Sequence, residues 1–231
     1  MTDWMEYVLA LTCFVASHFV PRLGGLRERL IAAIGRHAYF SVYGLFSLAL
    51  LVWVIVAAGR APYVMLWPQL PWTRWVPNLA MPIAVILATC GAGISQPFTL
   101  GGHRKAAFDA DTPGFAAISR HPLFLALALW AGAHLIPNGD LAHVVLFGSF
   151  LAMPLAAIPI FDAKARRDLA PGTRQAFFAA TSILSVAPLA DHRWLRANGR
   201  STAMKAGIAL VLWVGLLHLH TAVIGVSPFP V

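Results

Sequence analysis

The chain has 231 residues, of which 59% are hydrophobic and only 11% are charged. Its mean hydropathy is +0.72. Soluble domains carry about 25% charged residues, so this composition excludes an ordinary soluble protein and predicts an all-α polytopic integral membrane bundle. The formal net charge of +8 does not indicate nucleic acid as a partner, because membrane proteins concentrate Lys and Arg in their cytoplasmic loops.

Six apolar segments predict membrane-spanning helices, since each approaches the roughly 20 residues that a helix needs to cross a bilayer. The shorter apolar piece at 175–189 carries Pro188 and is expected to lie at the interface or to dip into the bundle instead of crossing the membrane. We expect the whole chain, residues 1–231, to form one transmembrane domain whose main partner is the lipid bilayer. The six predicted segments are residues 4–21, 38–58, 77–95, 122–137, 141–161 and 206–225.

Basic residues lie almost entirely on one side of this predicted topology. Of the seventeen Lys and Arg residues, which include Arg104 and Lys105, only Arg60 and Arg74 fall on the other side. The positive-inside rule assigns the basic side to the cytoplasm. The sequence therefore predicts a protein of the bacterial inner membrane with both termini in the periplasm.

Histidines inside the apolar segments are the main candidates for chemistry. An ionisable side chain at membrane depth predicts a functional site, although a neutral imidazole can also form a structural hydrogen bond between helices. We favour the structural role for His143, His218 and His220, which lie close to the outer surface of the predicted bundle. The five are His18, His134, His143, His218 and His220.

Two histidines belong to the stretch SRHPLFLALALWAGAHLIPNGD at residues 119–140. His121 and His134 are thirteen residues apart, which places them about 220° apart around a helix and therefore on nearly opposite faces. One pocket is not expected to use both. His134 follows Trp130 by one turn, on a face otherwise lined by small residues that could admit a flat ligand.

The start of this stretch has the residues of a helix N-terminus. Pro122 suits the first turn, and Ser119 is available as a cap. Backbone amides at a helix start, together with Arg120, predict a site suited to an anion. Residues 138–140, Asn-Gly-Asp, predict the end of one helix and the cap of the next.

Four pieces of the sequence carry a resemblance to a known family. They are HFVPRLGGLRERL, which begins at His18, followed by GRHAYFSVYGLFSL, SRHPLFLALALWAGAHLIPNGD and FDAKARRDLAPGTRQAFFAATSILSVAP. Together they span residues 18–188 and resemble membrane proteins of the NnrU family, whose relatives include the plant and cyanobacterial zeta-carotene isomerases. The isomerases carry a histidine and a tryptophan shortly before Arg-His-Pro, where this chain has FDADTPG with Asp109 and Asp111. The sequence is therefore more similar to the NnrU branch.

The resemblance implies a cofactor and two possible functions. In the isomerase branch a haem b lies between two histidines and a cis double bond of a carotene is isomerised; the ligands map to His18 and His134. The NnrU branch is linked to nitric oxide metabolism and denitrification. We expect haem b, with a carotenoid or nitric oxide as small-molecule partner. Whether the protein is an enzyme, in which case a cis-trans isomerase, or a haem-based sensor or accessory protein stays open.

Depth in the membrane makes His121 a rival to His134. On the predicted topology His18 lies about 6 Å from the cytoplasmic end of its helix, and His134 lies roughly 18 Å from the cytoplasmic end of its own. His121 matches the depth of His18 better. Arg27 could reach a haem propionate, because a guanidinium binds carboxylate in a bidentate fork. The predicted cofactor site thus comprises His18, His134, His121, Arg27 and Trp130, with His18 and His134 as the iron ligands.

A second resemblance concerns the same motif. Arg120, His121 and Pro122 at the start of a membrane helix, followed by a basic segment that begins at Asp162, are similar to the isoprenylcysteine-type membrane methyltransferases. In those enzymes the motif helps to hold S-adenosylmethionine. This chain has no paired glutamate in its second half, so we interpret the likeness as one of fold and keep a methyltransferase-like protein as a further alternative.

Overall fold

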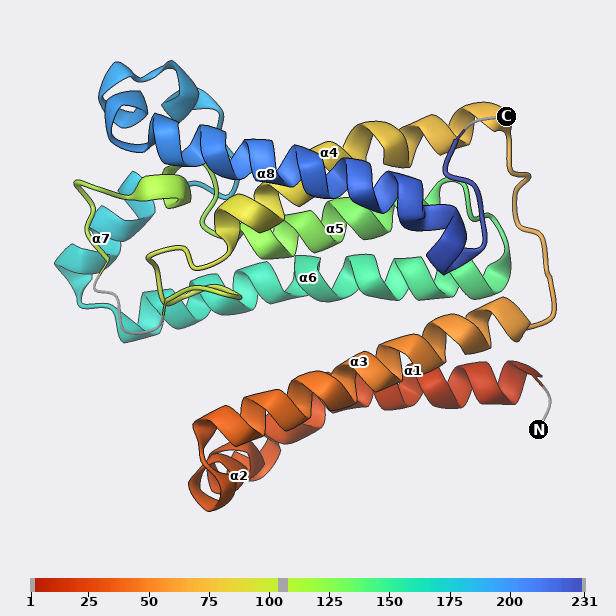
Figure 1. Cartoon of the computed structure of the whole chain (residues 1–231). Helices are drawn as coiled ribbons and strands as arrows, with labels where there is room; N and C mark the ends of the chain where they lie inside the picture. Colours follow the sequence, from red (N-terminus) through yellow and green to blue (C-terminus); the bar gives the residue numbers. More distant parts are fainter. Residues whose placement is uncertain (1–2, 104–107, 230–231) are drawn as a thin grey trace. The chain divides into compact units, whose positions relative to one another are not determined.

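The computed structural model describes residues 3–103 and 108–229, and within them the chain is largely helical (Figure 1). The prediction of an all-α membrane protein is confirmed. Arg104 and Lys105, two of the predicted cytoplasmic basic residues, lie outside the described ranges. The α-helices are α1 (Asp3–Phe19), α2 (Leu26–Ile34), α3 (Arg36–Arg60), α4 (Trp75–Gly91), α5 (Pro122–Leu135), α6 (Leu141–Asp168), α7 (Pro171–Ala180) and α8 (His192–Ile224), and the 3-10 turns are η1 (Val20–Gly25), η2 (Pro71–Arg74), η3 (Gly114–Ala117) and η4 (Ala187–Ala190).

Each predicted apolar segment contains a helix, but the helices differ in their fitness to cross a bilayer. Among the described residues four are long and apolar enough, within α3, α4 with η2, α6 and α8, and a fifth span results if α1 and α2 form one bent pair. Helix α5 has 14 residues, because Pro122 starts it and the turn before α6 ends it. The predicted count of six crossings therefore stays a prediction. Residues 175–189 contain the end of α7 and a turn, not a long helix.

The chain divides into two compact units, Met1–Pro68 with Asn138–Leu146 and Gln69–Pro137 with Phe147–Val231. The expectation of a single domain stays a prediction. In the first unit α1 packs along α3 (Figure 1). The hydroxyl of Tyr7, a fully buried residue, donates to the carbonyl oxygen of Ala142 at 2.8 Å. This bond ties α1 to the first turn of α6.

A bend follows α1. Gly24 and Gly25 have φ angles of 56° and 71°, the left-handed region that glycine enters without steric cost. The chain turns by 74° between residues 3–19 and 23–34. Helix α2 therefore runs away from the axis of α1.

The Asn-Gly-Asp turn at 138–140 has the predicted form. Asp140 caps α6, because its Oδ1 accepts from the amide of His143 at 3.2 Å. The carbonyl oxygen of Gly139 accepts from the amides of Leu66 and Trp67 at 2.8 and 3.1 Å. The loop that follows α3 is thus fastened to the turn that precedes α6.

Gly139→Ala is expected to destabilise the protein by roughly 1–3 kcal/mol, the usual cost of overpacking. A Cβ atom at this position would lie 2.5 Å from Cδ1 of Trp67 and also overlap the Trp67 carbonyl oxygen. Gly148→Ala, in the open interior of α6 where a Cβ meets nothing within 4 Å, is the control and should be neutral or stabilising. Thermal unfolding in detergent measures both. Equal melting temperatures for the two variants would contradict the prediction.

The second unit is built around α5. Helix α4 packs against both α5 and α8 (Figure 1). Helix α5 buries small residues on two nearly opposite sides, Ala128 and Ala131 on one and Ala126 and Ala133 on the other. The ring of Phe124 lies 5.1 Å from that of Phe161 of α6. Small side chains allow close helix packing in a membrane, and they position the start of α5 beside the second half of α6.

Candidate functional site

A buried ion pair joins the start of α5 to α6. Arg120 holds the Asp162 carboxylate with two hydrogen bonds, from Nε to Oδ1 at 2.9 Å and from Nη2 to Oδ2 at 2.6 Å. The two side chains are only 10% and 13% exposed. This bidentate geometry is the strongest form of an Arg–carboxylate pair, and the charge of each partner compensates that of the other.

His121 completes the cluster and is 1% exposed. Its Nε2 lies 2.9 Å from Oδ1 of Asp162, and its Nδ1 lies 3.2 Å from the hydroxyl of Thr99. A neutral imidazole satisfies both contacts, because Nε2–H can donate to the carboxylate while Nδ1 accepts from the hydroxyl. Burial lowers the pKa of His121, against the opposing effect of the hydrogen bond and charge of Asp162. Since Arg120 already neutralises the charge of Asp162, we assign the neutral form to the His121 imidazole.

Loop segments close around this group. The side-chain amide of Gln96 donates to the carbonyl oxygen of Arg120 at 2.5 Å, while its Oε1 accepts from the amide of Phe98 at 2.7 Å. The amide of Arg120 donates to the carbonyl oxygen of Ser182 at 2.7 Å. We call Gln96, Thr99, Arg120, His121 and Asp162 the buried polar cluster. It links the loop after α4, the start of α5, α6 and the segment after α7.

The predicted anion site at the start of α5 is occupied by the chain itself, because Asp162 supplies the anion. Ser119 does not cap the helix as expected. The N-cap is His121, without a side-chain cap bond, and the hydroxyl of Ser119 accepts from the His121 amide at 3.3 Å. The hydroxyl of Ser119 therefore bonds to the amide of the N-cap residue and not to an amide inside the helix.

The buried neutral His121 predicts a pH dependence. Its pKa is lower in the folded chain than in the unfolded chain, so the unfolded chain takes up the proton first as the pH falls below the ordinary histidine value of about 6.5. Stability should therefore be fully present above that value and decline below it. His121→Gln should show a smaller loss of melting temperature between about pH 7.5 and about pH 5.5 than the wild type. An equal loss in both proteins would contradict the assignment.

His134 lies in the last turn of α5 within an aromatic group. Its ring lies 5.7 Å from Trp130 and is stacked at 5.6 Å on Phe147. Trp130 also stacks on Phe150 at 5.7 Å. The Nδ1 of His134 lies 2.8 Å from the carbonyl oxygen of Trp130. Because a carbonyl only accepts, Nδ1 carries the proton and Nε2 carries the lone pair.

His18 has the same local arrangement at the end of α1. Its Nδ1 lies 2.8 Å from the carbonyl oxygen of Phe14, which again leaves the lone pair on Nε2. The ring of Phe14 lies 4.7 Å away. His18 belongs to the first compact unit and His134 to the second, so their pairing stays a prediction.

The other predicted site residues have definite neighbours. Arg27 lies with its Cζ 5.4 Å from the centre of the Phe40 ring, and its role toward a propionate stays a prediction. His143 bonds to Asp140 at 2.8 Å. The Nδ1 of His218 lies 2.8 Å from the Val214 carbonyl oxygen. Asp109 in FDADTPG forms a local turn with Thr112, and these hydrogen bonds lower the pKa of its carboxyl.

An apolar pocket of about 620 Å³ lies among α4, α5 and α8. Trp130 is one of its lining residues, while His134, one turn further, is not among them. The pocket therefore lies on the Trp130 side of α5, and a flat ligand on the face of His134 stays a prediction. Its lining is Met81, Ala84, Val85, Ala88, Thr89, Leu100, Leu123, Ala126, Leu127, Trp130, Leu212 and Leu216.

Comparison with known proteins agrees with the resemblance seen in the sequence. A family model described as NnrU protein matches residues 6–228, nearly the whole chain. The chain belongs to the NnrU family. The match covers most of both compact units of this NnrU-like membrane protein, including His18, His121 and His134. No curated protein and no solved structure shows significant similarity to it.

Sequence reasoning missed part of the buried polar cluster in this NnrU family member. Gln96 and Thr99 were not selected, and Asp162 was noted only as the start of a basic segment. The available signal is the group of three polar residues, Ser95, Gln96 and Thr99, in the short stretch ISQPFTLGG next to an apolar segment, since buried polar groups need partners. Within the described residues, no group of three or more His, Cys, Asp or Glu side chains could hold a metal ion.

Proposed function

We propose that this NnrU-like membrane protein binds haem b through His18 and His134 and acts in nitric oxide or nitrogen oxide metabolism. It would lie in the bacterial inner membrane with both termini in the periplasm, as the distribution of its basic loops favours. A bound haem would be held by His18 and His134 and would supply a redox-active iron able to bind a small gas.

One observation carries the proposal. In both histidines Nδ1 is hydrogen-bonded to the carbonyl oxygen one turn earlier, at 2.8 Å. Metal-binding histidines commonly donate their second ring nitrogen to such a carbonyl, which orients the ring and sets the tautomer. The donor set therefore fits iron, with each Nε2 as the ligand atom. His218 has the same hydrogen bond, so this bond makes a histidine suitable as an iron ligand but does not by itself identify which histidines bind iron.

The rival His121 fits less well. Both of its ring nitrogens are used, by Asp162 and by Thr99, inside a site with almost no exposure. Binding iron through Nε2 would leave Asp162 with Arg120 alone and open the buried polar cluster. This geometry supports His134 over His121 as the partner of His18, against the earlier argument from depth.

The haem proposal is tested by the absorption spectrum of the full chain. The protein is expressed in haem-sufficient cells, purified in detergent and recorded oxidised and reduced. We expect a Soret band and the sharp reduced bands of iron with two histidine ligands. Nitric oxide added to the reduced protein should shift these bands by replacing one ligand. A preparation without a Soret band would overturn the haem proposal.

The apolar pocket among α4, α5 and α8 favours a second candidate, a haem-dependent cis-trans carotene isomerase. A pocket of about 620 Å³ lined by Leu, Ala, Val and Trp130 suits an apolar ligand. Incubation with a cis-carotene and chromatography of the products distinguishes this activity from a sensor or accessory role. A methyltransferase-like function has less support, because Arg120 and His121 are engaged with Asp162.

A further inference from the structure

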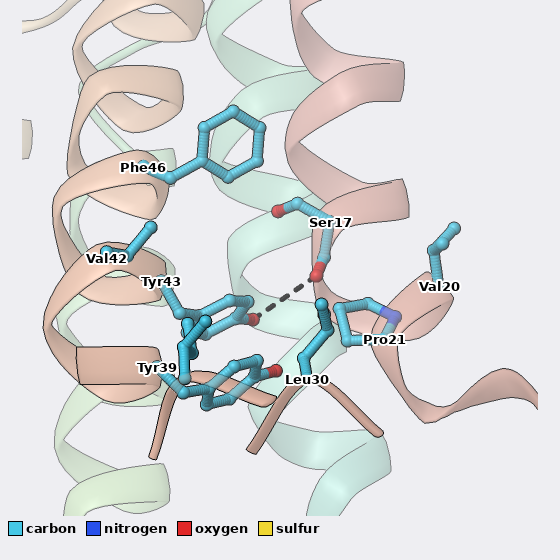
Figure 2. Close-up of a pocket in the computed structure, with 9 residues that line it drawn as sticks. Ser17, Val20, Pro21, Leu30, Tyr39, Val42, Tyr43 and Phe46 are labelled. Atoms are coloured by element: carbon cyan, nitrogen blue, oxygen red, sulfur yellow. Dashed lines mark hydrogen bonds between the residues drawn. The ribbon is translucent and has the colours of Figure 1, made fainter. Parts of the chain in front are cut away.

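A second cavity lies within the first compact unit. It has a volume of about 320 Å³ and lies between the end of α1, the bend after it, α2 and α3 (Figure 2). Figure 2 shows the rings of Tyr39 and Tyr43 reaching from α3 toward α1, with both hydroxyls on that side. The hydroxyl of Tyr43 donates to the carbonyl oxygen of Ser17 at 3.3 Å. Ser17, Leu30, Ile34, Tyr39, Val42 and Tyr43 are among the residues that line the cavity.

Helix α2 has the character of a helix that lies in a membrane surface. It follows the 74° bend, and its apolar residues recur at one-turn intervals as Leu26, Leu30 and Ile34, which are exposed by 39%, 39% and 50%. Leu30 and Ile34 also line the cavity. A short helix with an apolar row and flanking arginines is suited to the boundary between headgroups and acyl chains.

Two guanidinium groups share an aromatic ring that contacts the lining of this cavity. The Cζ atoms of Arg27 and Arg36 lie 5.4 and 5.1 Å from the centre of one ring, that of Phe40. Phe40 in turn lies 5.3 Å from Tyr39, which lines the cavity. Within the described residues neither arginine forms an ion pair with a carboxylate. Two cations that share one ring near an apolar cavity, and that have no carboxylate partner in the described part of the chain, are complementary to a molecule with a negative head and an apolar tail.

We propose that this site binds one anionic phospholipid. The phosphate lies against Arg27 and Arg36, since a guanidinium matches phosphate geometry, and part of an acyl chain fills the cavity beneath Leu30. The basic side of the protein is the predicted cytoplasmic side, where anionic lipids attract arginines at roughly 1 kcal/mol each. The ordered lipid would complete the groove between α1, α2 and α3.

Native mass spectrometry of the full chain tests the proposal. The protein is released from detergent containing equal amounts of phosphatidylglycerol and phosphatidylcholine with the same acyl chains. We expect the wild type to retain phosphatidylglycerol over phosphatidylcholine by roughly tenfold, and Arg27→Gln combined with Arg36→Gln to bring the ratio close to one. Arg193→Gln with Arg196→Gln, which removes the same charge from the exposed start of α8, should keep most of the preference.

Cavity-filling variants test the tail of the lipid. Val42 lines the cavity and is 61% exposed. The larger side chain of Val42→Trp can therefore fill the cavity without overpacking the core. It should reduce binding of both lipids severalfold while leaving their ratio unchanged, and Leu30→Phe should do the same to a smaller extent. Unchanged binding in both variants would overturn the assignment of the cavity.

Two further results would overturn the proposal. An equal loss of preference in the α8 control pair would mean that diffuse charge attracts the lipid. Loss of haem from the Arg27 and Arg36 variant, with the lipid ratio unchanged, would assign these arginines to a propionate instead. Haem content unchanged with the ratio lost supports the lipid site independently of the haem proposal.

Discussion

Asp162→Ala is expected to lower the free energy of unfolding by about 3–5 kcal/mol, the usual cost of removing one partner from a buried ion pair. In this variant the buried Arg120 guanidinium keeps the Thr181 carbonyl oxygen at 3.5 Å and the Phe178 ring as neighbours but has no carboxylate partner among the described residues. His121 also loses the acceptor for Nε2. Thermal unfolding in detergent, followed by circular dichroism, measures the loss.

Two variants separate this effect from a general loss of negative charge. Asp168→Ala removes an exposed carboxylate from the same helix, where Asp168 pairs with Lys164 one turn earlier. An exposed pair of this type contributes only about 0.3–0.5 kcal/mol. Asp162→Asn keeps one acceptor for Arg120, so its loss of unfolding free energy should lie between those of Asp162→Ala and Asp168→Ala. A loss in Asp162→Ala no greater than that in Asp168→Ala would show that the buried polar cluster does not stabilise the fold.

His18→Ala and His134→Ala are each expected to reduce retained haem by at least about tenfold. Residues that only orient a metal ligand already cost 10–100-fold in metal affinity when changed, so removal of a ligand should cost no less. The measurement is the Soret absorbance per protein after purification in the same detergent. Gel filtration of each variant confirms that the loss does not come from aggregation.

His218→Ala is the matched control for this pair. His218 has the same bond from Nδ1 to the carbonyl oxygen one turn earlier, at 2.8 Å, but it is not a predicted ligand. The variant should keep its haem. His121→Ala should lower the melting temperature, while the haem content per folded molecule should stay close to that of the wild type. Haem lost in His121→Ala and kept in His134→Ala would reverse the ligand assignment and support the argument from depth.

The sequence by itself determined the class of the protein and the approximate positions of its long apolar helices, but not helix α2 or the start of α8 at His192. Hydropathy alone locates α3, α4, α6 and α8, because burial in lipid requires long apolar runs whatever the tertiary packing. The turn before α6 was also predictable, since Asn, Gly and Asp act through local backbone preferences. The family followed from sequence motifs that lie in both compact units.

Only the tertiary structure decided what the Arg-His-Pro motif contacts. Arg120 and His121 lie 42 and 41 residues from Asp162 along the chain, and nothing in local sequence selects one acidic residue over another at such a separation. The predicted anion site was correct in chemistry, but its anion comes from α6. Arg27 of α2 likewise reaches the ring of Phe40 in α3 only because these two helices pack together, whereas Arg36 reaches the same ring one turn along α3. Local patterns determine helices and caps, whereas the partner of a charged side chain depends on which helices pack together.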